Sequence, residues 1–123
     1  MITAMLIAGV GGFVGTCCRY LIGRWMALAF HGVFPVGTFL VNILGCFVIG
    51  LCFGLIEKAN LLSSNESLLL VTGFCGGFTT FSAFANEIFT LGGRGEWLVS
   101  VLYLVASLAI GLFLVWCGRA LIR

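Results

Sequence analysis

Polar side chains recur at one-turn spacing within two long apolar stretches of the sequence. Residues three and four apart are neighbours on a helix, so each set would occupy one helical face. The hydroxyl and amide groups in these sets can all donate hydrogen bonds. Polar groups inside an apolar helix are costly and usually face an interior or a pore, so both faces are candidates for lining a path, with bonding between helices as the alternative. The two sets are Thr38, Asn42 and Gly45, and Tyr103, Ser107 and Gly111.

A third stretch, residues 73–84, reads GFCGGFTTFSAF and combines glycine, threonine and phenylalanine. Gly76 and Gly77 are adjacent, and each weakens a helix by about 1 kcal/mol relative to alanine. We therefore predict a helix broken near its centre, whose freed carbonyl groups could coordinate a cation. A glycine notch that allows close packing is the alternative.

The phenylalanines of this stretch offer a second kind of contact to an anion. An aromatic ring carries a positive edge, which an anion can approach. The residues concerned are Phe78, Phe81 and Phe84. Glu87 follows Phe84 by one helical turn, and we expect it to lie at a pore mouth or to pair with an arginine.

The composition indicates which elements must hold these residues. The chain has 123 residues, of which 62% are hydrophobic and 8% are charged, whereas soluble domains have about 25% charged residues. A membrane-spanning helix needs about 20 mostly apolar residues, and four stretches qualify, at residues 2–30, 34–56, 67–91 and 97–119. We predict an all-α membrane protein with one domain over residues 1–123, its third helix capped by Ser64 or Asn65.

Small residues at four-residue spacing predict close helix packing in all four spans. The pairs are Gly11 and Gly15, Gly50 and Gly54, Gly73 and Gly77, and Ser107 and Gly111. The six cysteines lie mostly in apolar stretches and act as small hydrophobic residues rather than a disulfide framework. No basic run suggests nucleic acid, and no nucleophile–base pair or metal cluster suggests an enzyme.

Charge does not favour either orientation in the membrane. Lys and Arg near helix ends normally mark the cytoplasmic side, but each side of a four-span arrangement holds three of them. This balance predicts insertion in both orientations and head-to-tail pairing; the alternative is that Arg19 is buried and does not count. The two sets are Lys58, Arg119 and Arg123, and Arg19, Arg24 and Arg94.

The sequence resembles the CrcB/Fluc family of fluoride channels along its whole length. The resemblance rests on GGFVGTCCRY at residues 11–20, PVGTFLVN at 35–42 and GFCGGFTTFSAF at 73–84. Two positions depart from the family pattern: Thr16 stands where Ala is frequent, and Ala83 stands where Thr is frequent. Ala83 could remove one hydroxyl from the pore.

The resemblance implies a fluoride-selective channel that exports fluoride after it has entered the cell as the neutral weak acid and ionised. It implies an antiparallel, dual-topology homodimer with two pores in the lipid bilayer of the bacterial inner membrane. Backbone carbonyls of Gly76 and Thr79 from both subunits would hold one structural sodium ion. The anion would be handled by Asn42, Phe81, Phe84, Tyr103 and Ser107, with Ser82 as a weaker candidate and Thr38 on the same polar face as Asn42.

Two other functions fit a chain of this size. A small dual-topology drug–proton antiporter also has four helices, but it needs a membrane-embedded acid, and none precedes Arg19 in the first span. A non-catalytic subunit of a larger membrane assembly would explain the glycines but not the two polar faces.

Overall fold

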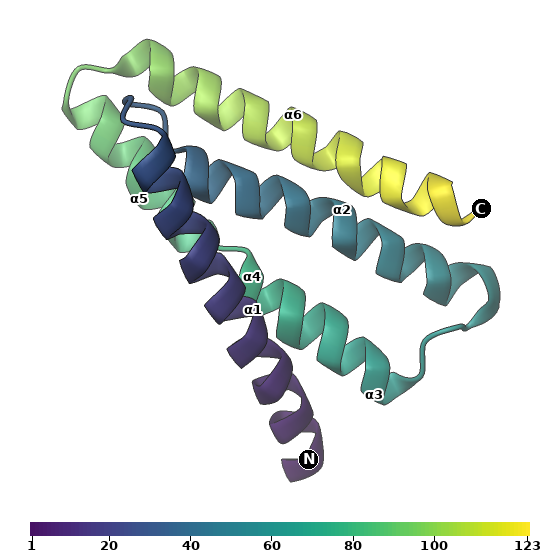
Figure 1. Cartoon of the computed structure of the whole chain (residues 1–123). Coiled ribbons are helices and arrows are strands. Elements are labelled where there is room, and N and C mark those ends of the chain that lie inside the picture. The colour runs from purple at the N-terminus through teal and green to yellow at the C-terminus, as the bar shows by residue number, and fades with distance from the viewer.

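The protein is a bundle of helices, seen in a computed structural model that describes the backbone of residues 1–123 and every side chain except that of Ala59 (Figure 1). Four of its helical segments are long and apolar enough to cross a membrane, as predicted. The third crossing is divided into four consecutive pieces, the second of which is a π-helix. The elements are α1 (Ile2–Ala29), α2 (Val36–Ala59), α3 (Ser64–Ser67), η1 (Leu68–Cys75), α4 (Gly76–Phe78), α5 (Phe81–Gly93) and α6 (Trp97–Ile122).

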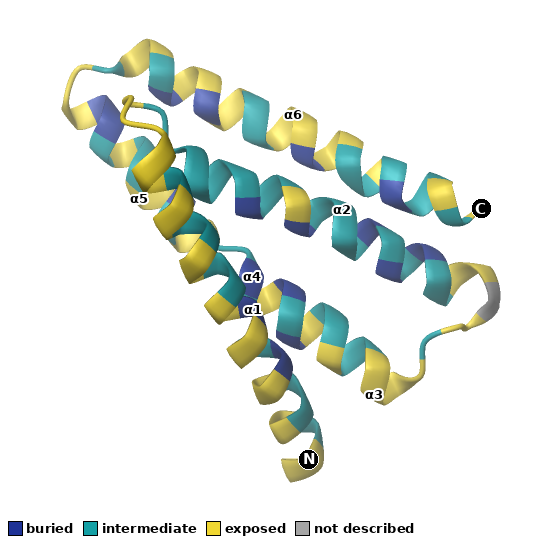
Figure 2. Cartoon of the chain, viewed as in Figure 1, coloured by how far each residue is buried: buried dark blue, intermediate teal, exposed yellow. Residues whose placement is uncertain are grey.

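Many large apolar residues are exposed along these helices (Figure 2). Phe13 on α1 is 72% exposed, and Leu112 on α6 is 71% exposed. Patches of this kind exceed what a soluble monomer carries and mark contact with lipid or with another protein chain. These apolar residues are therefore covered by a lipid bilayer or by another protein chain, and not by the core of this chain.

Local capping explains where the third crossing begins. Ser63 is the N-cap of α3, and its hydroxyl accepts a hydrogen bond from the Glu66 backbone N–H at 3.1 Å. The Glu66 carboxylate accepts the Ser63 N–H at 3.2 Å, which completes a capping box. The prediction of Ser64 or Asn65 as the cap was wrong, because only Ser63 has a glutamate three residues later to return the bond.

The third crossing is broken at two threonines rather than at the adjacent glycines. Thr79 (φ −97°, ψ 159°) and Thr80 (φ −149°, ψ 117°) are both extended, whereas Gly76 (φ −62°, ψ −38°) is helical. The predicted break near the centre of the helix is therefore present, two residues beyond Gly77. The glycines allow packing, and β-branched threonine suits the extended backbone.

The helices pack in two interleaved pairs. α2 runs beside α6, whereas α1 packs against η1 and α4 (Figure 1). A Cβ atom built on Gly73 would lie 2.6 Å from Ala8 O, and one on Gly77 would lie 2.5 Å from Gly12 O. The glycines thus bring backbone against backbone between α1 and the third crossing, which confirms the close packing expected from their spacing.

Candidate functional site

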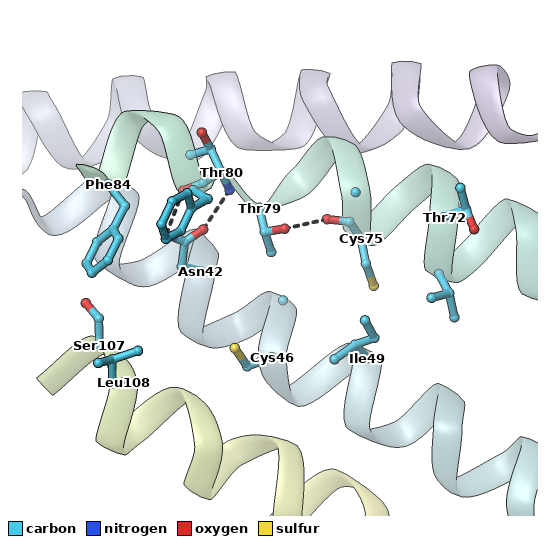
Figure 3. A pocket seen from close by; sticks show the side chains of 14 residues that line it. Asn42, Cys46, Ile49, Thr72, Cys75, Thr79, Thr80, Phe84, Ser107 and Leu108 are labelled. Carbon is cyan, nitrogen blue, oxygen red and sulfur yellow. Dashed lines mark hydrogen bonds between the residues drawn. The ribbon is translucent and has the colours of Figure 1, made fainter. Parts of the chain in front are cut away.

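A pocket of about 430 Å³ lies beside the helix break, between α2, the third crossing and α6 (Figure 3). It brings together residues from all three stretches that the sequence singled out. None of the residues that line it is charged. The predicted site residues in its wall are Asn42, Gly76, Thr79, Phe81, Phe84 and Ser107.

Asn42 forms hydrogen bonds to the extended backbone at the break through both the oxygen and the nitrogen of its side-chain amide. Its Oδ1 accepts the Thr80 N–H at 2.8 Å, and its Nδ2 donates to the Thr80 carbonyl at 3.1 Å (Figure 3). A backbone amide at membrane depth must find a partner within the protein. Asn42 therefore stabilises the extended conformation, and the second N–H of its amide, in a residue that lines the pocket, has no described partner.

The break diverts two hydrogen-bond donors from their usual helical acceptors. In an unbroken helix the Thr80 N–H would bond to the Gly76 carbonyl, and the Ala83 N–H would bond to the Thr79 carbonyl. Here Thr80 N–H binds Asn42, while Ala83 N–H binds Thr80 Oγ1 at 3.2 Å. The Gly76 and Thr79 carbonyl oxygens are thereby released, beside a pocket that both residues line.

Ser107 presents the pocket with a hydroxyl that has no protein partner. Its Oγ is buried and makes no hydrogen bond to any described residue. It points towards the ring of Phe84, which lies across the pocket on α5 (Figure 3). The Phe81 and Phe84 ring centroids are 6.1 Å apart with an interplanar angle of 51°. A hydroxyl donor and aromatic ring edges thus meet without a fixed positive charge.

Thr38 and Tyr103 are not part of this pocket, because Glu87 draws both hydroxyl groups to itself. Thr38 Oγ1 donates to Glu87 Oε2 and Tyr103 OH donates to Glu87 Oε1, each at 2.8 Å. The Tyr103 side chain is fully buried, and its ring meets Phe84 edge to face at 5.0 Å. Glu87 thus binds two hydroxyl donors and pairs with no described arginine, while its expected place at a pore mouth stays a prediction.

The sequence analysis did not predict the contact that Arg19 makes. Its Nε donates to the Gly77 carbonyl at 2.9 Å, close to the C-terminal end of α4. Cations stabilise the negative end of a helix, so Arg19 supports the first half of the broken crossing. The only sequence signal was an arginine one turn after Gly15, in a span whose one other charged residue is Arg24.

Ser82 lies outside the pocket. The residue is exposed, and its Oγ is 3.4 Å from Thr80 Oγ1. Of the predicted anion-handling set, the structure brings Asn42, Phe81, Phe84 and Ser107 to one pocket. Its lining does not include Thr38, Tyr103 or Ser82. The roles of all seven stay predictions.

Four apolar spans, three of which line an uncharged pocket at a helix break, define a small multi-pass membrane protein. Residues 6–119 match the family described as "CrcB-like protein, Camphor Resistance (CrcB)". The chain belongs to the CrcB family, as its three motifs had indicated.

Relatives named "Fluoride-specific ion channel FluC" resemble it over nearly the whole length. That of Prosthecochloris aestuarii is 47% identical over 121 residues, which covers 98% of this chain and 94% of the relative. That of Rhizobium etli is 43% identical over 123 residues, which covers 100% and 98%. That of Chlorobium chlorochromatii is 46% identical over 114 residues, which covers 93% and 88%. With these bacterial relatives and four spans, the chain is a multi-pass protein of the bacterial inner membrane.

Proposed function

We propose that this protein is a fluoride-specific ion channel that exports fluoride from the cell, and that the pocket beside the helix break forms part of the path. The observation that carries the proposal is the buried, unpartnered Ser107 hydroxyl facing Phe84. The names of the relatives supply the identity of the ion. A channel moves its ion without covalent chemistry, so no catalytic residue is assigned.

The chemistry of the pocket suits a small anion. Fluoride is strongly hydrated, so a path must replace its water with short, directed donors. Ser107 and the free N–H of Asn42 offer such donors, and the edges of Phe81 and Phe84 add a weakly positive rim. Conduction requires binding that is favourable but weak enough for release. A pocket wall without lysine or arginine meets that condition.

The drug–proton antiporter is the less favoured alternative. Such a transporter would need a carboxyl group that is free to exchange protons with its path. Glu87, one turn beyond the pocket residue Phe84, accepts hydroxyl hydrogen bonds on both oxygens and does not line the pocket. Glu87 is therefore better suited to accept the hydrogen bonds that order Thr38 and Tyr103 than to carry protons.

We further propose that two chains assemble as an antiparallel homodimer around one sodium ion. The released carbonyls of Gly76 and Thr79 are hard oxygen ligands, which suit such a cation. One chain offers two of these oxygens and a second copy would double them, so the ion would link the subunits and offset repulsion between neighbouring anions. Arg19 donates a hydrogen bond to the Gly77 carbonyl within the protein, so it need not count among the loop charges that set orientation. The dual-topology prediction therefore stays open.

The central experiment measures fluoride efflux from liposomes with a fluoride-selective electrode. Phe81→Ile is the sharpest variant, because Phe81 is 79% exposed and its loss disturbs little packing within the chain. An aromatic contact is worth about 1 kcal/mol, which corresponds to roughly a fivefold fall in rate. Phe89→Ile is the matched control, since Phe89 is 82% exposed on the same helix but lies outside the pocket.

Asn42→Asp and Phe84→Ile extend the test. The aspartate would repel the anion and would also face the Thr80 carbonyl with an oxygen in place of a donor, so we expect no measurable flux. Phe84→Ile should reduce flux while the protein stays folded. Parental rates in Phe81→Ile, Phe84→Ile and Asn42→Asp together would show that this pocket is not the path. No fluoride selectivity in the parent protein would reject the channel itself.

The assembly has its own tests. A reporter fused to the C-terminus should reveal both orientations in cells, and a single orientation would exclude the antiparallel dimer. Gly76→Val should abolish any stabilisation by sodium relative to a bulky organic cation. Thr79→Ala should retain it, because the proposed ligand is the backbone carbonyl and not the hydroxyl. Equal sodium responses in both variants would rule out this ion site.

A further inference from the structure

Charged side chains gather where α2 and α6 end together, far from the pocket beside the break. They line a second pocket of about 370 Å³ together with Gly54. Three cations and one carboxylate line it, so the net side-chain charge is +2. The four residues are Glu57, Lys58, Arg119 and Arg123.

Contacts within the protein neutralise only part of this positive charge. Glu57 pairs with Arg119, whose guanidinium also lies 5.3 Å from the centroid of the Phe53 ring. Lys58 Nζ donates to the Ile122 carbonyl at 2.8 Å. The Arg123 guanidinium is exposed and makes no hydrogen bond or ion pair with any described side chain. One carboxylate therefore serves three cations that are held within a single pocket.

The position of the cluster along the helices sets its depth in the membrane. Two candidate spans end here, one at Lys58 and the other at Ile122. Trp116 lies one turn before Arg119, is 58% exposed and stacks on Phe113. Exposed tryptophan marks the boundary between headgroups and acyl chains. The cations thus lie at headgroup level, next to exposed apolar side chains of α6 that include Phe113 and Trp116.

We propose that this pocket, which we call the α2–α6 basic pocket, binds the phosphate group of an anionic phospholipid. Basic pockets between membrane helices bind acidic headgroups, and each cation near an anionic surface contributes roughly 1 kcal/mol, or about a fivefold change in binding. An acyl chain can follow the apolar surface below, which a soluble anion cannot use. The inference concerns a different end of the molecule from the fluoride path and stands without it.

The test compares binding of phosphatidylglycerol and phosphatidylcholine to the whole protein by native mass spectrometry and by thermal unfolding in nanodiscs. The parent should prefer phosphatidylglycerol and unfold at a higher temperature in it. Removing one cation should weaken that preference about fivefold, and removing two about 30-fold. The variants are Arg123→Gln and the double variant Lys58→Gln/Arg123→Gln. Arg94→Gln in the α5–α6 turn is the matched control, because it removes an exposed cation at the opposite end.

Every outcome decides between the explanations. Arg123→Gln breaks no hydrogen bond or ion pair with a described residue, so an unchanged unfolding temperature in phosphatidylcholine would show that a loss of lipid preference does not come from misfolding. An unchanged preference in the double variant, or an equal loss in Arg94→Gln, would overturn the proposal. Inorganic phosphate added to protein in phosphatidylcholine gives the last comparison. Stabilisation equal to that by phosphatidylglycerol would identify a soluble-anion site and reject the lipid.

Discussion

The contact between α1 and α4 allows a quantitative prediction for Gly77→Ala. The new methyl group would lie 2.5 Å from Gly12 O and 3.0 Å from Gly12 Cα. Both neighbours are backbone atoms, so neither can rotate away, and the helices must separate by several tenths of an ångström to reach ordinary contact. Overpacking of this kind costs about 1–3 kcal/mol, while alanine returns about 1 kcal/mol of helix propensity.

Gly9→Ala on α1 is the matched control, since nothing lies within 4 Å of its added methyl group. Both substitutions gain the same propensity, so their difference isolates the overpacking term. We expect Gly77→Ala to be less stable than Gly9→Ala by about 1–3 kcal/mol. Reversible unfolding in mixed micelles, followed by tryptophan fluorescence at several protein concentrations, would measure the difference and separate folding from dimerisation. Equal stability of the two variants would refute the tight contact described between α1 and α4.

Three further substitutions test individual polar side chains, two of them in the same unfolding assay and the third by unfolding and by fluoride efflux. Thr80→Val removes the hydroxyl that accepts the Ala83 N–H and should cost about 1 kcal/mol, whereas Thr80→Ser should restore it; no difference between them would exclude the cap. Tyr103→Phe leaves one Glu87 oxygen without its hydroxyl donor and should cost about 1–3 kcal/mol, so an unchanged stability would show that water replaces the bond. Ser107→Ala removes no protein hydrogen bond, so it should lower fluoride efflux modestly without loss of stability, and destabilisation would contradict the unpartnered hydroxyl.

Periodicity and composition sufficed to predict the four crossings and the tight glycine contacts. Both depend on properties that are local to each helix: apolar length for a span, and small residues at one-turn spacing for a close face. Gly73 and Gly77 pack against α1 as expected. The position of the break was harder to predict from the sequence, because adjacent glycines and adjacent threonines are both plausible sites when the helix is considered alone.

What decides the break is a residue on another helix. Asn42 supplies an acceptor and a donor to Thr80, so the extended backbone is stabilised only after α2 is in place. Two members of the polar faces lie outside the pocket for a similar reason. Thr38 and Tyr103 have the right spacing to join the pocket, but Glu87 lies close enough to take both hydroxyls. Hydrogen bonds between distant segments leave no periodic signal in a sequence.

The interleaved pairing of the helices has a consequence for biosynthesis. α2 emerges from the ribosome directly after α1, yet its main partner is α6, the last segment to be made. α1 must likewise wait until η1 and α4 have entered the bilayer before its glycine face is covered. No neighbouring hairpin can therefore mature alone. A nascent chain halted after α5 would leave the α6-facing side of α2 open to lipid, and quality control could distinguish it from the completed product.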